Sequence, residues 1–94
     1  MKTIWKYKME DLDDTFEMPG GATIKHFGVQ REASGHLQFT FWAECLPGAP
    51  RIKRAFGVFD TGQDVPMEAV YHGTVQVPQT RSAELVYHLY ELPS

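Results

Sequence analysis

Apolar and polar side chains alternate in short stretches along most of the chain. The clearest stretch covers residues 37–45, in which every second residue is apolar: Leu37, Phe39, Phe41, Ala43 and Cys45. Successive side chains of a strand point to opposite faces, so a two-residue period predicts a strand with one buried face. We therefore expect these five side chains to face the interior.

The same alternation recurs between turn signals rich in glycine and proline. In the third stretch the apolar phase slips between Ile24 and Phe27, which predicts a β-bulge. No segment has a helical period, and at most one helical turn is expected, near residues 9–14 or 66–69. The pattern predicts a single all-β domain over residues 1–94, an antiparallel sandwich or barrel of about seven strands. The expected strands cover residues 3–9, 15–18, 22–30, 37–45, 52–58, 69–77 and 83–89.

Two hairpins follow from matching the apolar faces of consecutive strands. The loop at residues 47–50 predicts one hairpin with the pairs Phe41–Phe56, Phe39–Val58 and Ala43–Arg54. A turn centred on Thr80 predicts a second, with the pairs Val77–Ala83, Val75–Leu85, Gly73–Tyr87 and Tyr71–Leu89. This second register also places His72 opposite His88 on the outer face.

Composition and charge narrow the function classes. The net charge is −3, which argues against a general nucleic-acid binder, since such proteins need excess Lys and Arg. The lone Cys45 leaves no intramolecular disulfide, as in a reducing cytoplasm. The N-terminus resembles no secretory signal, and no stretch approaches the roughly 20 apolar residues of a membrane helix. We therefore expect a cytoplasmic protein that binds no membrane.

Catalytic and metal-binding motifs are not evident in the sequence. Neither a phosphate-binding glycine loop nor a zinc-binding histidine motif is present. Cys45 lies in phase with Phe39 and Phe41, which favours a buried apolar role over a nucleophilic one. His72 and His88 could form half of a metal site, but no third ligand is evident, and a surface pair is the simpler interpretation. We expect a non-enzymatic protein without a cofactor or metal.

Seven residues are candidates for ligand binding. Arg54 interrupts an apolar strand face opposite the small Ala43. It therefore either forms the bottom of an anion-binding pocket or pairs with Glu17, Glu44 or Glu68. Its neighbours Arg51 and Lys53 complete a basic cluster, which is a local patch or simply a solvated strand. The remaining candidates are Trp42, Tyr71, Thr61 and Gly62.

These remaining candidates are a possible aromatic platform and a possible anion-binding turn. Trp42 lies in the polar phase of its strand, where it either anchors a partner or covers a sheet edge. The turn at Thr61 and Gly62 either presents backbone N–H groups to an anion or is an ordinary glycine turn. The acidic residues Glu10, Asp11, Asp13 and Asp14 are either solvated or contact a basic protein.

The chain resembles a family of small phage and prophage proteins to which no activity is assigned. The resemblance rests on six segments and on their order and spacing; they cover residues 1–7, 18–24, 42–43, 56–62, 71–76 and 85–91. It departs from the family at Gly20-Gly21 and in the loop at residues 47–51. The resemblance implies phage origin and a shared fold, and no functional residues.

Small phage proteins often bind and disable host machinery. The expected function is therefore a non-enzymatic accessory protein that counters host defence in the host cytoplasm. It would bind a defence protein or sequester a nucleotide signal, using Arg54, Trp42, Tyr71 and the Thr61 turn, with sites between subunits if it forms an oligomer. The alternative is a phage structural or assembly module that forms oligomers through exposed β edges.

Overall fold

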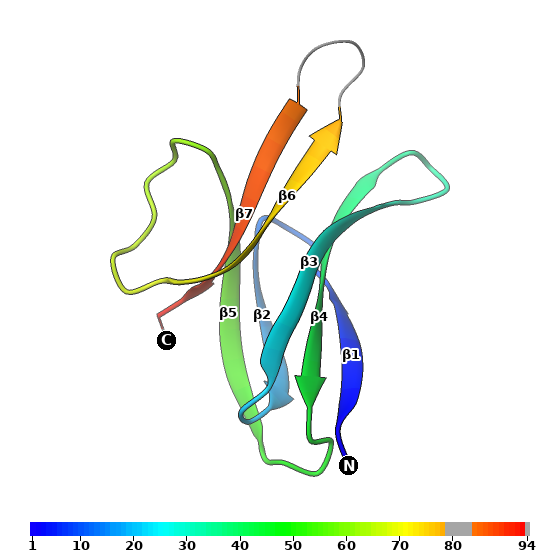
Figure 1. Cartoon of the computed structure of the whole chain (residues 1–94), viewed down its shortest axis with the longest axis vertical. Coiled ribbons are helices and arrows are strands. Elements are labelled where there is room, and N and C mark those ends of the chain that lie inside the picture. Colours follow the sequence, from blue (N-terminus) through cyan, green and yellow to red (C-terminus); the bar gives the residue numbers. More distant parts are fainter. Residues whose placement is uncertain (79–83, 94) are drawn as a thin grey trace.

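The computed structural model describes residues 1–78 and 84–93, which form seven strands (Figure 1). Both segments in which a helical turn was expected are bends or turns instead. None of the described residues forms a helix long and apolar enough to span a bilayer. The strands are β1 (Thr3–Lys8), β2 (Asp13–Pro19), β3 (Thr23–Arg31), β4 (Leu37–Cys45), β5 (Arg51–Asp60), β6 (Val70–Pro78) and β7 (Glu84–Leu92).

The strands form two antiparallel sheets that pack face to face. One sheet has the order β1-β4-β3 and the other the order β2-β5-β7-β6. Because each sheet keeps its own edges, the fold is a sandwich and not a closed barrel. The predicted all-β class with seven strands is confirmed.

The predicted β4–β5 hairpin is wrong. β4 pairs with β1 and β3, whereas β5 pairs with β2 and β7. The loop at residues 46–50 carries the chain from one sheet to the other (Figure 1). Phe41 and Phe56 do meet, with ring centroids 4.6 Å apart, but as partners between layers rather than within one sheet.

The β6–β7 hairpin exists, but its register differs from the prediction. Leu85 lies opposite Val77, and Tyr87 lies opposite Val75, a shift of two residues along β7. A bulge between Tyr71 and Gly73 then places Tyr71 opposite Tyr90 instead of Leu89. The predicted partner Ala83 and the turn at Thr80 lie outside the described residues.

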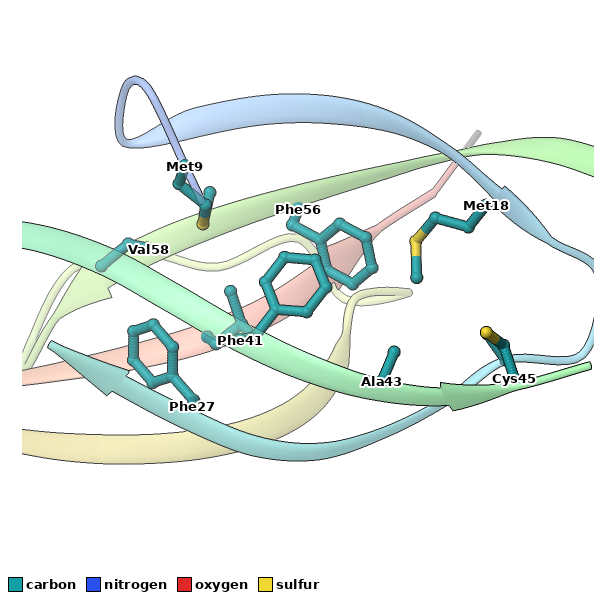
Figure 2. Close-up of a cluster of buried hydrophobic side chains, with 10 residues drawn as sticks. Met9, Met18, Phe27, Phe41, Ala43, Cys45, Phe56 and Val58 are labelled. Atoms are coloured by element: carbon teal, nitrogen blue, oxygen red, sulfur yellow. The ribbon is translucent and has the colours of Figure 1, made fainter. Parts of the chain in front are cut away.

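The core confirms the predicted strand faces. Phe41, Ala43 and Cys45 are buried, as expected from their shared phase on β4. Figure 2 shows the Phe41 and Phe56 rings side by side between the sheets, with the Met18 and Cys45 side chains farther along the interior. The expected bulge in β3 occurs between Ile24 and His26.

Glycine brings β6 close to β3 on one side of the sandwich. A Cβ at Gly73 would lie 3.2 Å from the Cβ of Phe27, which is tight for real side chains. Gly73 therefore permits the β6 backbone to lie against Phe27. Its neighbour across the hairpin is Leu89, not Tyr87.

Tyr7 carries an unpaired hydroxyl inside this core, and its replacement by phenylalanine is expected to stabilise the fold. Within the described residues, no hydrogen-bond partner lies within reach of the buried Tyr7 hydroxyl. The Phe variant keeps the ring against Phe41 and Phe16 and removes an unpaired polar group, which should add about 1 kcal/mol at neutral pH.

The advantage of the variant should grow in alkali. Burial raises the pKa of Tyr7, so the wild-type fold loses stability as the pH rises above the unfolded value of about 10. Urea unfolding at neutral pH and above pH 10 measures both effects. A Tyr7→Phe variant less stable than the wild type at neutral pH would contradict the prediction.

Candidate functional site

Arg54 sits on the inner face of β5 and forms a two-pronged ion pair with Glu91 of β7. Its Nε donates to Glu91 Oε2 at 2.7 Å and its Nη2 to Glu91 Oε1 at 2.6 Å. Its Nη1 donates to the Ala22 carbonyl oxygen at 2.6 Å. The partner is thus none of the three glutamates considered from the sequence, because β5 pairs with β7 and not with β4. Arg54 and Glu91 thus join two neighbouring strands of one sheet to Ala22, the residue just before β3.

A shallow cavity of about 340 Å³ lies beside this pair. Its wall includes Gly21, Lys53 and Arg54. The exposed fractions of the Arg54 and Glu91 side chains are only 13% and 21%. The cavity therefore contains a basic residue whose charge is already largely compensated by a carboxylate.

The bulge in β6 adds His72 to this cluster. It breaks the alternation, so that His72 reaches the interior and its Nε2 lies 3.0 Å from Glu91 Oε1. The Phe56 ring lies against both His72 and Arg54. Hydrogen bonds from Arg54 hold the pKa of Glu91 below its usual range, and the same hydrogen bonds raise the pKa of Arg54.

The predicted His72–His88 pair does not form. His88 lies opposite Thr74, and the bulge turns His72 inward toward Glu91. Among the described residues, no group of three or more His, Cys, Asp or Glu side chains could hold a metal ion.

The solvent-facing side of β5, β7 and β6 carries a set of aromatic and polar side chains, which we call the outer aromatic face. It comprises Tyr71, Thr74, His88 and Tyr90 together with Phe59, which is itself buried, with 8% exposed. Cross-strand pairing places them on one side, because Tyr71 lies opposite Tyr90 and His88 lies opposite both Phe59 and Thr74. The Tyr90 ring packs edge-on against Phe59 and Tyr71, with centroids 5.7 and 5.5 Å apart.

A chain of hydrogen bonds crosses this face. The Tyr71 hydroxyl bonds the Thr74 hydroxyl, which bonds His88 Nδ1 at 2.9 Å. His88 Nε2 in turn bonds the hydroxyl of Thr61 at 2.9 Å. Thr61 precedes Gly62, whose φ of 93° is a left-handed turn conformation that suits glycine. The tertiary structure thus brings Tyr71 and the Thr61–Gly62 turn together.

The other candidates lie elsewhere. Trp42 is half-buried on the outer face of the opposite sheet, where its ring lies near Gly28 and 5.4 Å from the His26 ring. Arg51 stacks over the Trp5 ring at 4.9 Å, and Lys53 is exposed opposite Glu17. Within one copy of the chain, Arg54, Trp42 and Tyr71 do not line a common pocket, because they lie on β5, β4 and β6 and on different faces of the two sheets.

Sequence reasoning missed Glu91 and Tyr90 as site residues and considered His88 only as a partner of His72. Glu91, Tyr90 and His88 all lie on β7, and each depends on the register of that strand with its neighbours. The alternation at residues 84–92 does separate His88 and Tyr90 from the inward Leu89. The alternation along β7 therefore indicates which of its side chains point outward, but not which residues of the neighbouring strands they contact.

Comparison with known proteins gives a family and no activity. A domain of unknown function (DUF7352) matches residues 1–94. No curated protein and no solved structure matches the chain. Because the match spans the whole sequence, the chain belongs to the DUF7352 family of domains of unknown function.

Proposed function

We propose that this protein is a non-enzymatic accessory protein of phage origin that counters host defence by covering a basic surface of a host defence protein. The outer aromatic face would make the contact, in the cytoplasm of the host cell. The observation that supports this most is the ordered, solvent-facing array of Tyr71, Tyr90 and His88. Phage origin rests on the sequence resemblance described above.

The composition and order of this face suit protein recognition. The exposed fraction of Tyr71 is 53%, and Met67, in the loop that leads to β6, is exposed at 95%. Tyrosine and methionine are enriched in protein interfaces. The chain of hydrogen bonds that runs from Tyr71 through Thr74 and His88 to Thr61 holds these side chains in place before a partner arrives, which reduces the entropy lost on binding.

Acidic residues indicate the charge of the partner. The loop between β5 and β6 runs from Thr61 toward Tyr71. Asp60 just before this loop and Asp64 and Glu68 within it are all exposed. A partner with Lys or Arg around an apolar centre would complement this arrangement and be steered toward it.

A nucleotide signal is less well supported than a protein partner. A phosphate group needs an uncompensated cation or a cluster of free donors. Arg54, the best candidate, already gives its donors to Glu91 and Ala22. Trp42, the expected base-stacking platform, lies on the other sheet.

The test is a phage challenge in strains that each carry one defence system. Expression of the wild-type protein should restore plaque formation in at least one strain. Tyr71→Ser should abolish this rescue, and its affinity for the purified defence protein should fall roughly tenfold or more, as for a residue at the centre of an interface. Isothermal titration calorimetry measures the affinity.

Leu46→Ser provides a matched control. The exposed fraction of Leu46 is 50%, close to that of Tyr71, but Leu46 lies in the loop between β4 and β5. This variant should retain rescue and affinity. Rescue in no strain, or equal rescue by Tyr71→Ser, would show that the proposal is wrong. A nucleotide retained by the protein in native mass spectrometry would favour signal sequestration instead.

A further inference from the structure

β1 and β2 form the two open edges on one side of the sandwich. Each strand comes first in its sheet, so within the described residues β1 bonds only to β4 and β2 only to β5. Residues 9–12 connect them directly from one layer to the other. Except at Thr15, whose N–H donates to Asp14 Oδ1 at 2.8 Å, the outward backbone N–H and C=O groups of these edges are available to pair with another strand.

Contacts across the interior fix the relative level of these two strands. Tyr7 packs against Phe16 with ring centroids 5.5 Å apart. Farther along, Arg51 stacks over Trp5 and is the partner of Pro19 on β2. The strands therefore run in opposite directions, with Lys6 at the level of Glu17 and Lys8 at the level of Thr15.

The solvent-facing side chains of the two edges have opposite charge. On β1 they include Lys6 and Lys8, which are exposed. On β2 they include Asp13 and Glu17, also exposed. Lysines on an edge strand normally discourage pairing with another chain. Here, however, β2 carries acidic side chains at the same level as the lysines of β1. The lysine edge of one copy therefore attracts the acidic edge of a second copy.

We propose that two copies of this chain associate through this side, around a two-fold axis parallel to the strands. Such an axis exchanges the layers while it keeps the level and direction of each strand. β1 of one copy then lies antiparallel beside β2 of the second copy, and the reverse contact forms by symmetry. Lys6 comes next to Glu17 of the second copy, and Lys8 comes next to Thr15 and Asp13.

The interior side chains near this side agree with the arrangement. Trp5, Tyr7 and Phe16 are each only partly buried within one copy. In the dimer, a neighbouring strand extends each sheet and covers the exposed parts of these three rings. Burial of apolar surface then adds to the backbone hydrogen bonds and the ion pairs.

Charge exchange between the edges tests the proposal. Sedimentation velocity should show that the wild-type protein dimerises and that added salt weakens the dimer, because the ion pairs are exposed. The Lys6→Glu/Lys8→Glu variant and the Asp13→Lys/Glu17→Lys variant should each weaken the dimer roughly tenfold or more. Each carries like charges on both edges.

Restoring the dimer by combining the two charge-reversed variants provides the decisive result. An equimolar mixture of the two variants should form a heterodimer, and a chain with all four changes should dimerise by itself. Circular dichroism checks that each variant is folded, and Lys25→Glu, on β3, is the control that should leave the dimer intact. A monomeric wild-type protein, or charge-reversed variants that neither dissociate alone nor reassociate when mixed, would overturn the proposal.

Discussion

Replacing Phe41 by alanine is expected to lower the free energy of unfolding by about 3–5 kcal/mol, the usual cost of deleting a fully buried aromatic ring. Phe41 has no exposed surface. Its ring contacts that of Tyr7 in the same sheet and, across the sandwich, those of Phe16 and Phe56, with centroids 4.6–5.4 Å apart. Removing it takes away both transfer free energy and the contact that joins the two sheets.

A domain of this size has only about 5–15 kcal/mol of stability in total. We therefore expect Phe41→Ala to unfold at a much lower urea concentration than the wild type, in a transition followed by tryptophan fluorescence. Leu46→Ala, in an exposed loop, should change stability by no more than about 0.5 kcal/mol. A cost below about 1 kcal/mol for Phe41→Ala would contradict the packing described here.

Glu91→Gln is expected to cost about 2–3 kcal/mol at neutral pH. The substitution leaves the mostly buried Arg54 without its carboxylate and weakens the contact with His72. The value lies below that for a fully buried ion pair because the exposed fraction of the Glu91 side chain is 21%, so water partly solvates the remaining charge.

The cost of Glu91→Gln should depend on pH. The pKa of Glu91 is lowered in the folded protein, mainly by its hydrogen bonds from Arg54. Its contribution is therefore complete above the unfolded value of about 4.3 and is lost as the pH falls through the lower folded pKa. The difference between wild type and variant, measured by urea unfolding across the acidic range, should shrink below about pH 4.

Glu32→Gln, on the exposed turn between β3 and β4, is the control and should give a small difference at every pH. A cost of Glu91→Gln that stays constant from neutral to strongly acidic pH would show that the charge of Glu91 is not the stabilising feature. A negligible cost at neutral pH would show that the Arg54 pair contributes little.

Except at the start of β6, the sequence predicted which side of the strands faces the core. The apolar phase of β4 led to the buried Phe41 and Cys45, and the slipped phase of β3 led to its bulge. Both features are local, because they depend only on the alternation of side chains along one strand. The alternation also separated Arg54 as a charged residue on an inward face.

The candidate site was predicted only in fragments. Tyr71 and Thr61 were recognised separately, but their connection passes through His88 and Thr74 on two paired strands. The bulge at His72 changed the phase of β6, which moved Tyr71 to the outer face and His72 to the inner face. A bulge in a polar stretch leaves little trace in the hydrophobic pattern.

By itself, then, the sequence determined an all-β chain of seven strands and the face that each presents to the core, except at the start of β6, where the bulge reversed the faces of Tyr71 and His72. The tertiary structure alone decided which strands are neighbours: β4 and β5 lie in different sheets, and Arg54 of β5 meets Glu91 of β7. The physical reason is that a two-residue period specifies only whether a side chain points inward. An inward Phe41 meets Phe56 equally well within a sheet or across the sandwich, and packing of the whole chain selects between them.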